Sequence, residues 1–198
     1  MTGLKQTPSQ TVGPFFAYGL TPEQYGYAFA SLAGPDLAVS DADGERIRIE
    51  GRVFDGEGKL VPDAMIEIWQ ADGQGRYAHP LDGRGSNAGF KGFGRVGTGT
   101  DPEQRYVFNT VKPGSVDGQQ APHINVIVFM RGLLLHAYTR LYFSDEVDAN
   151  ARDEVLASVP ADRRDTLIAQ RADGPEGVMV YRFDIHMQGD QETVFFDA

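Results

Sequence analysis

The stretch Ala121-Pro122-His123-Ile124-Asn125-Val126-Ile127-Val128-Phe129-Met130-Arg131 contains the most apolar strand candidate in the chain. From residue 124 to residue 129 only Asn125 is polar, which predicts a central strand covered on both faces. His123 begins this strand and Arg131 follows its end. The stretch therefore indicates where the core lies, and it places an imidazole and a guanidinium at opposite ends of one rigid element.

Other short segments show the alternation of apolar and polar residues that is typical of half-exposed strands. The predicted strands cover residues 46–54, 64–70, 105–111, 133–143, 167–171 and 178–187. A turn at residues 55–58 makes the first two a hairpin or a sheet corner, and residues 133–143 form a hairpin with the strand after His123. Short strands with turns between them, and no alternation with helices, predict an all-β sandwich.

The remaining segments are predicted to be irregular or helical. Residues 71–100 are rich in glycine, which predicts a long surface excursion around Tyr77, Phe90 and Phe93. Ser144 is the expected N-cap of a short helical insert near residues 144–165, which Pro160 ends or restarts. Residues 1–35 form an expected N-terminal arm before a domain at 36–198, and the arm folds on its own domain or docks on a partner. The aromatic residues in the tail at 192–197 predict that it is packed down.

Composition excludes several classes of function. The chain has 198 residues with 41% hydrophobic residues, which is enough for one globular domain. Its net charge of -10 disfavours binding to nucleic acids or to anionic membrane surfaces. It has no cysteine, no signal-peptide pattern and no apolar run of roughly 18 residues, so we expect a cytoplasmic protein.

Only one stretch indicates metal chemistry, and it does so incompletely. Residues 123 and 125 project from the same face of a strand, so two histidines there could share a metal ion. Here His123 has Asn125 as its neighbour. A single imidazole is more commonly a hydrogen-bonded core histidine, because metals need several protein donors. The chain has no G-x-S-x-G, phosphate-binding loop or H-E-x-x-H motif.

Seven blocks of sequence, taken together and in order, resemble the intradiol ring-cleavage dioxygenases. The blocks are Gly51-x-Val53-x-Asp55, Ile66-Glu67-Ile68-Trp69-Gln70-Ala71-Asp72, Gly75-Arg76-Tyr77, Phe93-Gly94-Arg95, Thr110-Val111-Lys112-Pro113-Gly114, Ala121-Pro122-His123-Ile124 and Leu141-Tyr142-Phe143. The resemblance implies a β-sandwich and a ferric site made by two tyrosinates and a His-x-His pair. His123 matches the first histidine, and Asn125 replaces the second.

The tyrosine ligands that the resemblance implies have no counterpart in this chain. Residues 78–95 and residues 115–121, where the family places them, contain no tyrosine, and Tyr77 matches a position that is not a ligand. Fe(III) requires anionic oxygen ligands for charge balance. We therefore expect this chain to bind no metal, with His123 and Asn125 at degenerate ligand positions and no catalytic residue of its own.

Residues 7–16 and 192–197 resemble one subunit type within the family, which pairs with an iron-bearing beta subunit of the same fold. The resemblance implies that Fe(III) is held by this partner in a hetero-oligomer, which cleaves 3,4-dihydroxybenzoate with O2 to 3-carboxy-cis,cis-muconate. It also implies that Thr11, Gly13 and Pro14 wall the partner's cavity and that Arg131 faces the substrate carboxylate. Arg131 at the end of an apolar strand independently needs an anion, either the substrate or a local carboxylate.

Two other functions stay open from the sequence. The first is a non-catalytic binding or assembly module that kept the fold. The second is an enzyme with rearranged ligands drawn from His79, His136 or Tyr138, of which the last two share one strand face.

Overall fold

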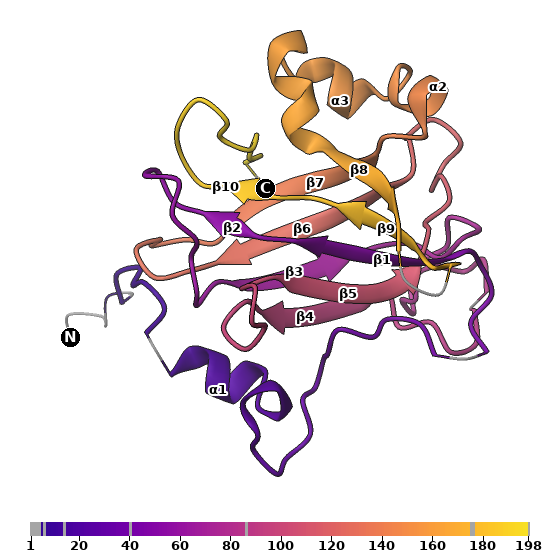
Figure 1. Cartoon of the computed structure of the whole chain (residues 1–198). Helices are drawn as coiled ribbons and strands as arrows, with labels where there is room; N and C mark the ends of the chain where they lie inside the picture. The colour runs from indigo at the N-terminus through magenta and orange to yellow at the C-terminus, as the bar shows by residue number, and fades with distance from the viewer. Residues whose placement is uncertain are drawn as a thin grey trace.

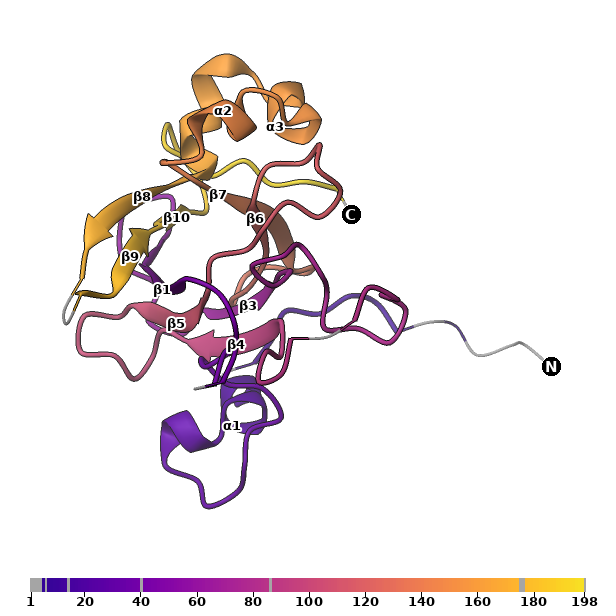
Figure 2. The ribbon, with the colours of Figure 1, turned by 90° about the vertical axis from the view of Figure 1, so that its right-hand side faces the viewer.

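The computed structural model describes residues 5, 7–13, 15–39, 41–85, 87–174 and 177–197. Within these residues two layers of β-strands face each other around one core, which confirms the predicted sandwich (Figures 1 and 2). No helix in the described ranges is both long enough and apolar enough to cross a membrane.

The first layer contains the strand predicted at residues 46–54. Its members are β5 (Tyr106–Val111), β1 (Arg46–Gly51), β9 (Met179–Arg182) and β8 (Ile168–Asp173), in that order. β1 pairs antiparallel with β5 and parallel with β9. Ile47 and Ile49 of β1 are buried against the second layer, and each such side chain contributes roughly 1.5–3 kcal/mol to folding.

The second layer contains the strand that begins with His123. Its members are β4 (Phe93–Gly97), β3 (Met65–Trp69), β6 (His123–Phe129) and β7 (Ala137–Phe143), in that order. β6 is central, as predicted, but only one of its faces is fully buried, because Asn125, Ile127 and Phe129 are half-buried. β8 joins the layers by pairing with β7 and with β9. A small sheet of β2 (Val53–Phe54) and β10 (Ile185–His186) closes one end.

The open edge between β4 and β5 is closed by residues 34–39. The amide of Leu37 donates to Asn109 of β5, and the carbonyl of Leu37 accepts from Lys91, just before β4. Gly94 of β4 permits this approach, since a Cβ there would lie 2.4 Å from Leu37 Cδ1. Residues 34–39 therefore belong structurally to the sandwich, although residues 34 and 35 fall within the range predicted for the arm.

The helices are short and lie at the margins of the sandwich (Figure 2). α1 (Phe16–Leu20) and the 3-10 helix η1 (Glu23–Tyr25) lie beside β4, and α2 (Val147–Asn150), α3 (Glu154–Ser158) and η2 (Ala161–Leu167) lie at the opposite margin, near β7 and β8. The helical insert is confirmed, but the prediction that Ser144 caps it is wrong. Asp153 caps α3 instead, because its buried carboxylate accepts from Leu156 N.

The structure also tests the predictions for the glycine-rich segment, for the first two strands and for the tail. The prediction of one long surface excursion over residues 71–100 is wrong at its end, because Phe93–Gly97 forms β4 and pairs with β3. Residues 46–54 and 64–70 form a corner between layers and not a hairpin, since β1 and β3 are not paired. The tail is packed as predicted, with Phe196 N donating to Tyr138 O at 2.8 Å.

Candidate functional site

His123 is held at the head of β6 as a neutral imidazole. Its side chain is buried, and Nδ1 donates to the carbonyl of Ala121 at 2.9 Å. Burial lowers the pKa of His123 more than the bond to Ala121 raises it. The remaining ring nitrogen, Nε2, can accept a hydrogen bond or bind a metal ion, so His123 could supply one donor and no charge.

Asn125 does not replace the missing ligand. Its amide Nδ2 donates to Trp69 O of β3 at 3.4 Å, a long bond that turns the donor end of the side chain to the neighbouring strand. An amide oxygen is a weak neutral ligand for Fe(III), which favours anionic oxygen. The position therefore contributes neither charge nor a strong donor.

The nearby phenols are protonated. Burial raises the pKa of Tyr77, whose ring is stacked on Trp69 with centroids 5.6 Å apart. Burial also raises the pKa of Tyr142 to about 12, and the Tyr142 hydroxyl donates to Asp153 at 3.1 Å. Both phenols are therefore engaged within this chain, Tyr77 by stacking on Trp69 and Tyr142 by its bond to Asp153.

A guanidinium lies on the same face of the sheet. Arg140 of β7 is directly opposite Asn125 in the strand register, and its Nη1 donates to Gln120 Oε1 at 3.0 Å. Its positive charge adds to the lowering of the His123 pKa and partly opposes the raising of the Tyr142 pKa, which places it near both. One imidazole beside a neutral amide, a phenol bound to Asp153 and a guanidinium do not fit a ferric ion, and no group of three or more His, Asp or Glu in the described ranges could hold a metal.

The residues predicted to face a substrate lie at the other end of β6. Arg131 follows β6 in the loop before β7; its side chain is 55% exposed, and its Nε pairs with Asp63. Thr11 of the arm is brought to this loop, because its hydroxyl accepts from Gly132 N at 2.8 Å. Gly13 O accepts from Phe16 N at 3.3 Å, and Pro14 lies outside the described residues. The structure therefore brings together Thr11 and Arg131, with Gly13 two residues along the arm.

The two ends of β6 are far apart. Arg131 is eight positions after His123, and the strand within that span, His123–Phe129, is about 20 Å long at roughly 3.3 Å per residue. Arg131 therefore cannot bind a molecule located at His123. The structure places Thr11 at the loop that contains Arg131, and Asp63 is the local carboxylate that the sequence left open as a partner of Arg131.

The alternative ligands are not assembled into a site. His136 Nε2 and the Tyr138 hydroxyl are 2.5 Å apart, so these two side chains bind each other. His79 Nδ1 accepts from Leu81 N at 3.2 Å, in the loop before β4. With no further donor gathered around them in the described ranges, a metal site built from these residues is not supported.

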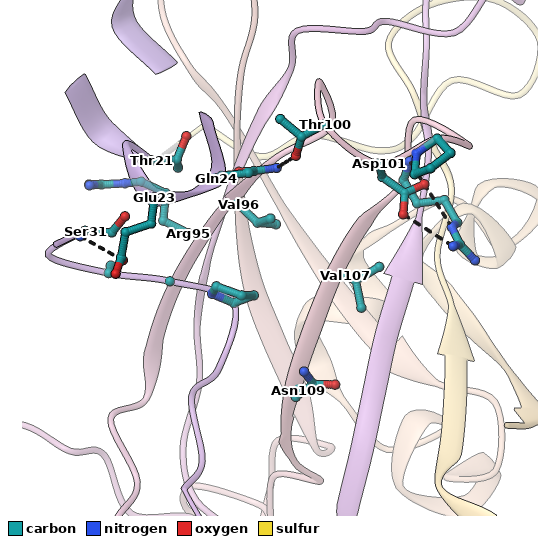
Figure 3. A pocket seen from close by; sticks show the side chains of 15 residues that line it. Thr21, Glu23, Gln24, Ser31, Arg95, Val96, Thr100, Asp101, Val107 and Asn109 are labelled. Carbon is teal, nitrogen blue, oxygen red and sulfur yellow. Dashed lines mark hydrogen bonds and ion pairs between the residues drawn. The ribbon is translucent and has the colours of Figure 1, made fainter. Parts of the chain in front are cut away.

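A cavity of about 500 Å³ lies between the arm and the edges of β4 and β5 (Figure 3). Gln24 donates to Gly97 O at 2.6 Å and to Thr100 Oγ1 at 2.7 Å. Arg105 is paired with Asp101 at 3.2 Å on the far wall. These polar groups of the lining therefore bind one another or the backbone.

Comparisons of the sequence and of the fold identify related proteins. The family model described as Dioxygenase matches residues 30–189. The chain is 58% identical to the protocatechuate 3,4-dioxygenase alpha chain of Burkholderia cepacia over 100% of both chains. It is 35% identical to the protocatechuate 3,4-dioxygenase beta chain of Burkholderia cepacia, over 76% of this chain and 67% of that one. The fold is similar to that of an intradiol ring-cleavage dioxygenase from Tetranychus urticae, with a TM-score of 0.60, 13% identity and coverage of 85% and 94%.

Proposed function

Since the chain belongs to the intradiol ring-cleavage dioxygenase family, we propose that it is the alpha subunit of a protocatechuate 3,4-dioxygenase. With a beta subunit of the same fold, it cleaves 3,4-dihydroxybenzoate with O2 to 3-carboxy-cis,cis-muconate. Identity across the full length of an alpha chain, and lower identity to a beta chain, support this assignment.

One observation supports a role as a wall of a partner's cavity. The face around His123 does not fit a metal ion, and Arg131 and Thr11 lie together at the opposite end of β6. A chain with its own active site would need its anion-binding arginine near its metal ligands. Here the two are separated by the length of a strand, so Arg131 serves a centre that another chain supplies.

The arm and the loop after β6 have separate roles in this proposal. Arg131 binds the carboxylate of the substrate, which lies far from the two carbons that react. Asp63 engages only Nε of Arg131, and this leaves the Nη groups to form bonds with a carboxylate. Thr11, Gly13 and Pro14 of an arm at residues 1–35 wall the cavity. The domain at residues 36–198 supplies the sandwich.

The partner supplies the metal chemistry in this proposal. The beta subunit would hold Fe(III), which would supply the activation of the catechol, and this chain orients the other end of the ring. A negatively charged chain without cysteine is compatible with our proposal that the hetero-oligomer works in the cytoplasm.

The test is purification of the chain alone and together with a beta subunit. We expect the chain alone to bind less than stoichiometric iron and to consume no O2 with 3,4-dihydroxybenzoate. The co-expressed pair should co-purify, contain iron and cleave the substrate. Stoichiometric iron and activity in the chain alone would contradict the proposal. A chain that serves only for assembly would leave the KM of the pair unchanged when Arg131 is replaced.

A further inference from the structure

We infer that Arg140 supplies a fixed positive charge at the position that a metal ion takes in the family. This charge repels a metal ion and so opposes metal binding at residues 123 and 125. The loss of ligands at residue 125 and in the loops is then only part of the reason why no metal binds. This inference rests on family membership and does not depend on how the chain uses a partner.

The register of β6 and β7 places Arg140 on the face of the degenerate ligand positions. Arg140 pairs with Asn125, and Tyr142 pairs with His123. Directly opposed residues in antiparallel strands have Cβ atoms about 4.5–5.5 Å apart and project from the same face. The four side chains therefore form one square, and a metal ion bound by residues 123 and 125 would lie over it.

The guanidinium of Arg140 leans toward the head of β6. Its Nη1 donates to Gln120 Oε1 at 3.0 Å, and Gln120 lies three residues before His123. Gln120 is itself oriented, because its Nε2 donates to Asp117 Oδ2 at 3.1 Å. These bonds hold the guanidinium toward the end of β6 at which His123 lies, and its charge acts on the imidazole of His123.

The charge of Arg140 is not compensated at short range. No carboxylate in the described ranges lies within 4.0 Å of it, whereas Arg76, Arg95 and Arg105 each have a carboxylate partner within that distance. A guanidinium stays protonated at all ordinary pH values. A second cation at the square would therefore meet a positive charge that has no direct ion-pair partner.

The inference is tested by restoring the second histidine with and without Arg140. The probe is Zn²⁺, titrated by calorimetry against the full chain. We expect Asn125→His alone to bind Zn²⁺ no more tightly than the unmodified chain does. The double variant Asn125→His with Arg140→Leu should bind Zn²⁺ with a Kd at least tenfold lower than that of Asn125→His alone.

Three matched variants control this comparison. Asn125→His with Arg140→Lys keeps the charge and should bind no better than Asn125→His alone. Asn125→His with Arg182→Leu removes an exposed arginine of β9, and it should also leave binding unchanged. If Arg140→Leu does not fold, Arg140→Gln removes the charge while keeping a partner for Gln120. Equal affinity of Asn125→His with and without Arg140, or tight binding by the Arg140→Lys variant, would overturn the inference.

Discussion

Replacing Arg131 with alanine in the assembled enzyme should raise KM for 3,4-dihydroxybenzoate by about 10- to 30-fold. A charge-assisted hydrogen bond contributes about 1.5–3 kcal/mol. Because the Arg131 side chain is 55% exposed in this chain and pairs with Asp63, the lower part of that range applies, about 1.5–2 kcal/mol. At about 1.4 kcal/mol per factor of ten, this gives the stated change in KM.

The effect should fall on KM, because the carboxylate is remote from the reacting carbons and is bound equally before and during the reaction. We expect kcat to change by less than about threefold. The assay is the initial rate of O2 consumption at varied substrate concentration, with the Arg131→Ala variant paired with an unmodified beta subunit.

Two variants at ion pairs serve as controls. Asp63→Asn removes the competing carboxylate and should leave KM unchanged or lower it by less than about fivefold, since half-exposed ion pairs contribute up to about 1 kcal/mol. Arg182→Ala removes an arginine of the other layer that is 64% exposed, and it should leave KM unchanged. An unchanged KM in Arg131→Ala, or the same loss in Arg182→Ala, would refute the assignment of Arg131.

Three further predictions concern folding. Asp153→Ala should lower the free energy of unfolding by about 3–4 kcal/mol in urea denaturation, because its buried carboxylate accepts three hydrogen bonds. Gly94→Ala should lower it by about 1–3 kcal/mol, because the new Cβ would lie 2.4 Å from Leu37. Burial alone would raise the pKa of Asp145, but the hydrogen bonds from Lys112 and Tyr181 and the charge of Lys112 together outweigh it, and the net pKa is lowered. This contribution to stability is complete above about pH 4 and is lost as the pH falls through the lowered pKa, so Asp145→Asn should flatten the loss of stability below about pH 4.

Controls for these folding predictions are available in the same chain. Gly19→Ala places a methyl group in open space within α1 and should leave stability unchanged or raise it by less than about 1 kcal/mol. Asp153→Asn should be less damaging than Asp153→Ala, since the amide oxygen still caps α3. Equal stability of Gly94→Ala and Gly19→Ala would show that Leu37 moves aside at no cost.

Much of the sandwich was predictable because its strands carry a local pattern. The alternation of Ile47 and Ile49 with charged residues in β1 identifies a buried face without any knowledge of its neighbours. The run after His123 identified the central strand of the second layer, and the order of the sequence blocks indicated the family. β4 was missed because its alternation is hidden by Gly94 and Gly97, whose presence is explained only by the segments that pack beside them.

The absence of the metal ligands is determined by the sequence alone. Asn125 at the second histidine position, and loops without tyrosine, remove donors whatever the fold does. A resemblance between aligned segments is enough to identify such losses, because each ligand is a single residue type at a single position.

Only the tertiary structure shows which side chains lie beside residues 123 and 125 and where Thr11 of the arm lies. The pairing of Arg140 with Asn125 depends on the register between two strands, and the bond from Gly132 to Thr11 joins segments 121 positions apart in the chain. The periodicity of apolar residues predicts which face of a strand is buried. It does not predict which distant residues contact that face, because those contacts depend on how all the strands pack together.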